Sequence, residues 1–170
     1  MVLLAHPTGN VFVREAACAL HDTKHLKEFH TTIAACGRNF FAKMAAWPGC
    51  AEILRRKLPA SIEKNLRLHP AREVGRLLAS RAGLRFATKH EVGFFSVDAV
   101  YSAFDKCVSK RIRKENFSVV YCYEDGALET FRMAKSKGLS CIYDLPIAHW
   151  ALVRQLMAEE ADRLPDWACT

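Results

Sequence analysis

The chain begins with an apolar run, a polar turn and a segment of helical periodicity. Apolar residues fill Val2–Ala5, and turn-forming residues follow from His6 to Asn10. Between Val11 and Leu20, apolar side chains return at the spacing of one helix face. The pattern predicts a short strand, a turn that contains Gly9, and a helix.

The middle of the chain is less regular. Phe29–Ile33 has the composition of a second strand, and Asn65–Leu68 that of a third strand, which ends before His69. Between them, the apolar spacing of Phe40–Leu54 predicts a helix that stops ahead of Pro59. The assignments between Gly37 and Glu91 rest on the weakest patterns.

The second half alternates clearly between helical and strand patterns. One face of an amphipathic helix collects the apolar residues Val97, Val100, Tyr101, Phe104, Val108 and Ile112. We then expect a strand over Ser118–Tyr123, a helix over Gly126–Ser136, a strand over Ser140–Tyr143 and a helix to about Arg163. Lys137 and Gly138 give the first of these helices a cationic last turn and a glycine stop.

Strands and helices thus alternate along the chain, and the predicted strands are apolar on both faces. Such strands are typical of a parallel sheet covered by helices on both sides. With 170 residues and 51% hydrophobic content, the chain is long enough for one core of its own. The sequence predicts one α/β domain over residues 1–170, a three-layer Rossmann-like fold with a mostly parallel sheet.

The net charge of +7 and the pI of about 9.2 favour anionic partners. Two basic clusters, Arg55–Lys57 and Lys110–Lys114, are either solvated helix faces or binding surfaces for acidic lipid headgroups. Nucleic acid is an unlikely partner, because aromatic residues do not interleave with the basic ones. One interpretation of the chain is therefore a non-catalytic basic α/β module that binds an acidic or phosphorylated partner.

Several motif classes are missing from the sequence. There is no GxGxxG or GxxxxGK[ST] loop, so we expect no dinucleotide cofactor and no P-loop. The histidines show no HExxH motif, and the seven cysteines form no CxxC pair, so we expect no metal site. Cysteines inside apolar runs and the absence of a signal peptide or membrane span indicate a cytoplasmic protein.

Polar residues follow the predicted strands. Because the carboxyl ends of parallel strands meet at one edge of the sheet, these residues are candidates for a ligand site. They are His6, Thr8, Gly9, Asn10, Thr31, Thr32, His69, Glu124, Asp125 and Asp144. Gly9 would let a ligand approach the backbone, although a turn glycine followed by the helix cap Asn10 explains the same residues.

The acidic residues at the strand ends also have two interpretations. Glu124 or Asp125 could accept hydrogen bonds from sugar hydroxyls or serve as a base, and either could instead cap the next helix. Asp144 has the same two options, because Pro146 suits a first helical turn. Carboxylates on neighbouring strand ends favour a site more than either one alone.

Four of these segments together resemble the N-terminal half of bacterial family 4 (group 1) glycosyltransferases. The segments are His6-Pro7-Thr8-Gly9-Asn10 with Val13-Arg14, Phe29-His30-Thr31-Thr32-Ile33, Tyr123-Glu124-Asp125-Gly126-Ala127, and Ile142-Tyr143-Asp144-Leu145-Pro146 with Trp150. The resemblance spans nearly the whole chain in order. It implies one half of a GT-B enzyme, in which two Rossmann-like domains face a cleft and a sugar is transferred with retention from a nucleotide-sugar donor, without a required metal.

The resemblance also implies roles for individual residues. Those expected to bind the acceptor are His6, Thr8, Gly9, Asn10, Arg14, Thr31 and Thr32. Those expected to be catalytic are Glu124, Asp125 and Asp144, the last at a position where the family often has histidine. The donor-binding half would follow Trp167, so we expect an incomplete enzyme that is inactive alone. Its acceptor would be a sugar or a lipid-linked sugar, and its location cytoplasmic or peripheral to the inner face of the membrane.

Overall fold

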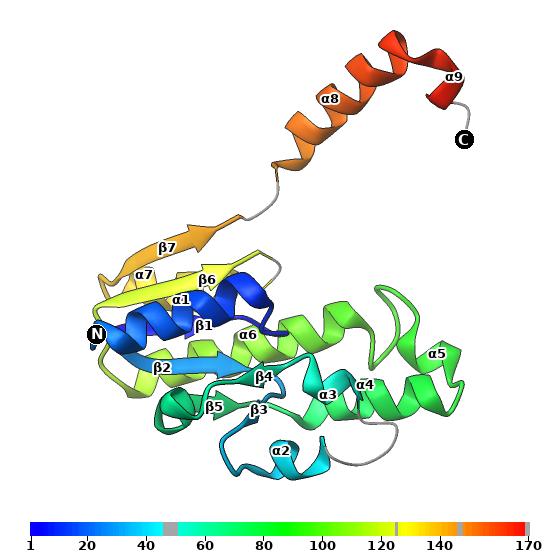
Figure 1. The fold of residues 1–170 in the computed structure, drawn as a ribbon. Helices are drawn as coiled ribbons and strands as arrows, with labels where there is room; N and C mark the ends of the chain where they lie inside the picture. The colour runs from blue at the N-terminus through cyan, green and yellow to red at the C-terminus, as the bar shows by residue number, and fades with distance from the viewer. Residues whose placement is uncertain (46–50, 125, 146–147, 169–170) are drawn as a thin grey trace.

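The computed structural model describes residues 1–45, 51–124, 126–145 and 148–168. Its centre is a five-stranded sheet in the order β5-β2-β1-β6-β7 (Figure 1), and all its strand pairs are parallel. The strands are β1 (Val2–Ala5), β2 (Leu26–Thr31), β5 (Leu66–Leu68), β6 (Val119–Tyr123) and β7 (Ser140–Asp144). The chain has the expected α/β class, a three-layer Rossmann-like fold.

Helices cover the two faces of the sheet (Figure 1): α1 (Val11–Asp22) lies on one, and α6 (Val97–Lys114) and α7 (Leu128–Ser136) lie on the other. The alternation of side chains along β1 explains the arrangement. Leu4 packs with the α1 residues Val13 and Ala17, whereas its neighbour Leu3 packs with residues of α6. Both sides of β1 are therefore buried, as its uninterrupted apolar run predicts.

The expectation of one helix over Phe40–Leu54 was wrong. The structure has α2 (Phe40–Met44) and α3 (Ala51–Leu54), and residues 46–50 between them lie outside the described part. Pro48 and Gly49 in that stretch disfavour a continuous helix. The sequence patterns also missed β3 (Ala35–Cys36) and β4 (Lys57–Leu58), which form a small parallel sheet, as well as the 3₁₀ helix η1 (Ala60–Asn65), α4 (Ala71–Arg81) and α5 (Arg85–Thr88).

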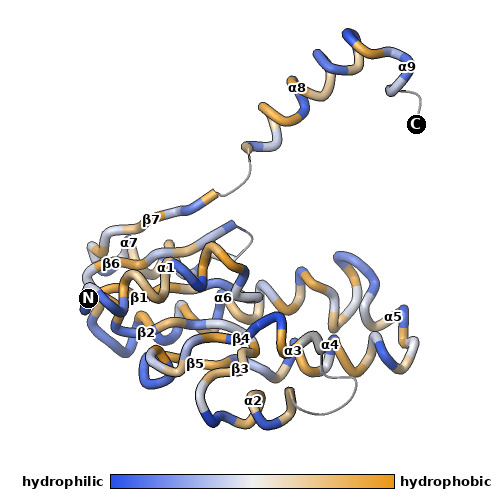
Figure 2. The backbone as a smooth tube through the Cα atoms, viewed as in Figure 1, coloured by the Kyte–Doolittle hydropathy of each residue, from blue (hydrophilic) through white to orange (hydrophobic). Residues whose placement is uncertain are grey.

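The expectation that every strand is buried on both faces fails for β7. This strand is the edge of the sheet, and Ile142 and Tyr143 are 46% and 53% exposed. Beyond it, α8 (Trp150–Arg163) and α9 (Pro165–Ala168) extend away from the sheet (Figure 1). Apolar and polar positions alternate along α8 (Figure 2). Across the described residues, no helix combines the length and apolar character that a membrane crossing requires.

Candidate functional site

The order of the strands identifies one place in the sheet where a crevice is expected. From β1 the chain proceeds outward to β2 and β5, and then returns to β6 on the other side of β1. The carboxyl ends of β1 and β6 therefore flank the point where the strand order reverses, which is where open α/β sheets bind ligands. The turns after these two strands are in contact, because a methyl group added at Gly126 would lie 3.8 Å from Cδ of Pro7.

The turn after β1 is organised by its own side chains. Nδ1 of His6 accepts hydrogen bonds from the backbone N–H groups of Thr8, at 3.1 Å, and Gly9, at 2.8 Å. Gly9 has φ +64°, a left-handed conformation that favours glycine. Oδ1 of Asn10 accepts from the N–H of Val13 at 3.0 Å, which confirms Asn10 as the helix cap.

His6 can hold this turn because its imidazole is neutral. The ring is 7% exposed, and it meets the ring of Tyr123 edge-on with centroids 5.3 Å apart. Burial, together with the positive charge of Arg56, lowers the pKa of His6 to about 4. At neutral pH the unprotonated Nδ1 is therefore an acceptor for the two N–H groups of the turn.

The predicted residues of β2 support the same turn. Thr31 and Thr32 are each 1% exposed, and both hydroxyls donate to the carbonyl oxygen of Pro7. Thr31 also lies beneath Gly9, since a methyl group there would be 3.6 Å from its Oγ1. These threonines thus position the turn from below and do not face solvent. Arg14 lies in the first turn of α1 and pairs at 3.4 Å with the neighbouring carboxylate of Glu15.

The acidic candidates lie at the same edge, on the other side of β1. Glu124 directly follows β6 and is half-buried, whereas Asp125 lies outside the described residues. Asp144 pairs with Tyr123 in the register of β6 and β7, and it accepts a hydrogen bond from the hydroxyl of Tyr121 at 2.7 Å. The sheet therefore aligns Glu124 with the turn after β1 and places Asp144 one strand farther away.

The N-terminus of α7 is closed by a side chain that the sequence patterns did not identify. Both carboxylate oxygens of Asp105, on α6, accept from the N–H groups of Glu129 and Thr130, at 2.8 and 2.9 Å. This bond crosses from one helix to another, so it has no local signature in the sequence. Because those N–H groups are occupied, they do not form an anion site.

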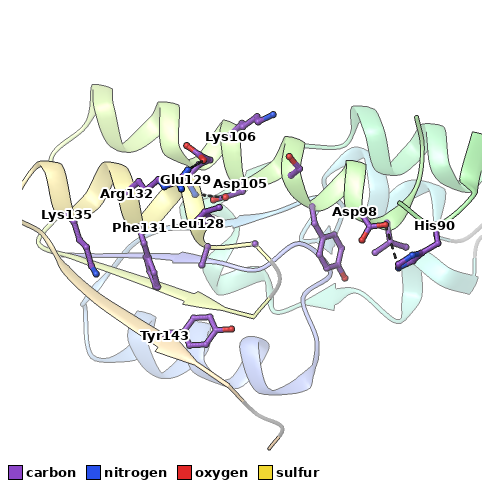
Figure 3. Close-up of a pocket in the computed structure, with 15 residues that line it drawn as sticks. His90, Asp98, Asp105, Lys106, Leu128, Glu129, Phe131, Arg132, Lys135 and Tyr143 are labelled. Atoms are coloured by element: carbon purple, nitrogen blue, oxygen red, sulfur yellow. Dashed lines mark hydrogen bonds and ion pairs between the residues drawn. The ribbon is translucent and has the colours of Figure 1, made fainter. Parts of the chain in front are cut away.

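A broad groove of about 1170 Å³ adjoins this region on the α6 face (Figure 3). Gly126 and Ala127 of the turn after β6 line it, together with residues of α6, α7 and β7. Aromatic rings of Tyr101, Phe131 and Tyr143 line it together with basic groups of α7. The groove therefore runs along the helices from the turn after β6, whose motif the sequence analysis selected.

A second polar cluster lies under α6. The sequence analysis selected His69 as a strand-end residue but did not predict its contacts with the rest of the cluster. Oε2 of Glu28 lies 2.9 Å from Nε2 of His30, and Nδ1 of His30 lies 2.9 Å from Nε2 of His69. Arg111 donates two hydrogen bonds to the carboxylate of Glu28, at 3.0 and 2.6 Å. We call this cluster the Glu28–His30–His69 network. Glu28 and His30 are two positions apart, so both lie on one face of β2. This spacing is the sign of the cluster that the sequence contains.

Part of the expected basic surface is engaged inside the protein. Arg56 is 6% exposed, pairs with Glu73 at 2.6 Å and donates to Oγ1 of Thr32 at 3.3 Å. The solvated-face interpretation is therefore wrong for Arg56, and also for Arg111, which binds Glu28. Lys110, Arg113 and Lys114 are exposed.

Within the described residues, no group of three or more histidine, cysteine or acidic side chains is arranged to hold a metal ion. In comparisons with known proteins, no family model, no curated protein and no solved structure matches the chain. The geometry of the site and the motifs of the sequence are therefore the basis of the functional interpretation.

Proposed function

We propose that this chain is the acceptor-binding half of a retaining GT-B glycosyltransferase, which transfers a sugar from a nucleotide-sugar donor. The observation that supports this proposal best is the meeting of the His6–Asn10 turn with the turn after β6 at the reversal point of a parallel sheet. A second domain would bind the donor across the cleft. Without that domain, we expect the chain to bind acceptor but not to transfer sugar.

The groups at this edge suit a polyhydroxylated ligand. Asn10 is exposed, and while its Oδ1 caps α1, its Nδ2 amide has no hydrogen-bond partner among the described residues. Glu124 brings a carboxylate to the opposite side of the crevice. Amide donors and carboxylate acceptors are the groups that pair with sugar hydroxyls. In this proposal Asn10 and Glu124 orient the acceptor, and Asp144, held by Tyr121, lines the site.

A lipid-linked acceptor would bring the domain to the inner face of a membrane. The exposed basic residues Lys110, Arg113 and Lys114 lie at the end of α6, and such a cluster attracts anionic headgroups. The proposed location is therefore cytoplasmic and, for such an acceptor, peripheral to the membrane.

Calorimetric titration of the full chain with methyl glycosides of glucose, galactose and mannose tests the proposal. Asn10→Asp keeps an oxygen that can cap α1 but loses the amide donor, and Glu124→Gln removes the charge. Since a hydrogen bond contributes about 1 kcal/mol, each variant should weaken binding roughly fivefold.

A triple Lys110→Gln, Arg113→Gln, Lys114→Gln variant is the control, and we expect it to bind the glycosides as the wild type does. If no glycoside binds, the proposal is wrong. Binding of phosphorylated peptides that the triple variant abolishes, without any glycoside binding, would instead support the anionic binding module.

A further inference from the structure

In the Glu28–His30–His69 network, the donor and the acceptor of each hydrogen bond follow from which groups carry a proton. Glu28 is 2% exposed, and although burial by itself would raise its pKa, hydrogen bonds from His30 and Arg111 hold that pKa below the usual range. Its carboxylate therefore only accepts, so Nε2 of His30 must carry the proton that it donates. In a neutral imidazole the other nitrogen is then an acceptor.

The second hydrogen bond fixes the tautomer of the next ring. Nδ1 of His30, as an acceptor, requires that Nε2 of His69 carry a proton. The planes of the two rings differ by only 17°, so the bond lies close to the plane of both rings. Burial lowers the pKa of both histidines, that of His69 to about 4, so both rings are neutral at pH 7. Nδ1 of His69 is left unprotonated.

This nitrogen has no hydrogen-bond partner in the described part of the chain. No described residue donates a hydrogen bond to Nδ1 of His69, and no buried side-chain nitrogen or oxygen among the described residues lacks a partner. Nδ1 is therefore not completely buried, and His69 as a whole is half-buried. Arg111 and Arg67 approach Glu28, at 2.6 and 3.4 Å, and are the charged groups next to the network.

His69 lies at the same edge of the sheet as the proposed acceptor site. It directly follows β5, and its N–H donates to the carbonyl oxygens of Thr31 and Thr32 at the end of β2. The ring of Phe104 separates it from the turn after β6, because Phe104 lies 5.6 Å from the His69 centroid and its Cδ1 is 3.9 Å from a methyl group added at Gly126.

We propose that Glu28, Arg111 and His30 are positioning residues that hold His69 as its Nε2–H tautomer, so that Nδ1 accepts a hydrogen bond from a hydroxyl group of the acceptor sugar. The inference rests on the proposed function for the identity of the ligand. The tautomer itself does not depend on that function. His69 is then a binding residue at the carboxyl edge of the sheet, after β5, which is separated from β1 by β2.

Imidazole nitrogen spectra of the ¹⁵N-labelled full chain at pH 7 test the tautomer. We expect an unprotonated Nδ1 and a protonated Nε2 for His69, and a mixture of tautomers in His30→Phe, which removes the acceptor. The Nδ1 signal of His6 is the internal control and should stay unprotonated in both proteins. A protonated Nδ1 on His69 in the wild type would overturn the proposal.

Titration with the same methyl glycosides tests the ligand contact. His69→Ala should weaken binding about five- to tenfold, and His69→Asn, whose amide oxygen can take the place of Nδ1, should restore part of the affinity. If glycosides bind through Asn10 and Glu124 while the His69 variants bind normally, this inference is wrong and the proposed function stands. If no glycoside binds at all, both are wrong.

Discussion

His6 and His69 occupy equivalent places in the fold but differ in their hydrogen bonds. Each directly follows a strand at the carboxyl edge of the sheet, and burial lowers the pKa of each to about 4. Nδ1 of His6 is occupied by the N–H groups of Thr8 and Gly9, whereas Nδ1 of His69 has no described partner. Burial and a lowered pKa are therefore common to the structural histidine and to the proposed binding histidine. The two differ in whether Nδ1 already accepts a hydrogen bond.

The surroundings of the two histidines are also parallel. Below the turn that His6 holds, Thr32 leads to Arg56 and to the buried carboxylate of Glu73, on α4. On the α6 side, His30 leads to the buried carboxylate of Glu28 and to Arg111. The arginines differ, since the Arg56 side chain is 7% exposed and that of Arg111 is 34% exposed. The first network is therefore closed, and the second reaches the surface.

The largest predicted effect is the loss of stability when a buried carboxylate is removed, and it should be larger for Glu73 than for Glu28. Glu73→Ala removes the carboxylate that pairs with Arg56, whose side chain is 7% exposed, so we expect it to lower the free energy of unfolding by about 3–5 kcal/mol in urea denaturation. Glu28→Ala should cost only about 2–3 kcal/mol, because Arg111 is partly solvated and keeps Glu115 at 3.4 Å. An equal or reversed order would contradict the description of one closed and one open network.

Acid should act through His6. Its pKa is 6.5 unfolded and about 4 folded, so between these values the unfolded state binds more protons and stability falls as the pH falls. The stability that the neutral ring contributes, on the order of 3 kcal/mol, is present in full above pH 6.5 and is lost by about pH 4. Urea denaturation at a series of pH values measures it.

The control for the acid effect is His6→Asn. An asparagine oxygen can accept from the same two N–H groups but does not titrate, so this variant should lose the His6 share of the pH dependence in that window, while His30 and His69, whose pKa values are also lowered by burial, keep theirs. A wild-type stability that stays flat from pH 7 to pH 4.5 would show that His6 does not hold the turn as a neutral acceptor.

The smallest effect concerns the glycines of the two turns. Gly9→Ala places a side chain at φ +64°, which should cost about 1–2 kcal/mol, while the added methyl group makes only ordinary contact with Thr31. Gly126→Ala is the matched control, because no positive φ is required there and Pro7 is 3.8 Å away. Thermal denaturation should show a lower Tm for Gly9→Ala than for Gly126→Ala.

Much of the fold could be predicted from local patterns. The apolar run of β1, the cap Asn10 and the one-sided spacing of α6 each arise from neighbouring residues. The two-residue strands β3 and β4 are too short to show any period, and the exposure of β7 depends on its place at the sheet edge. Such features follow from tertiary structure, which a single sequence does not display.

The candidate site also has a part that the sequence predicts and a part that it does not. The strand-end residues were found because parallel strands bring their carboxyl ends together. His69 was found in the same way, but its contact with His30 was missed because the two residues are 39 positions apart and only the pairing of β2 with β5 joins them. The pairing of Arg56 with Glu73, 17 positions apart, likewise leaves no local pattern in the sequence.

The most direct test of the whole account is a map of backbone amide shifts when methyl glycosides are added to the ¹⁵N-labelled full chain. The account predicts the largest shifts at the carboxyl edge of the sheet, at Gly9, Asn10, Glu124 and His69. Largest shifts at Lys110, Arg113 and Lys114, or no shifts at saturating glycoside, would contradict the claim that this edge binds the acceptor sugar.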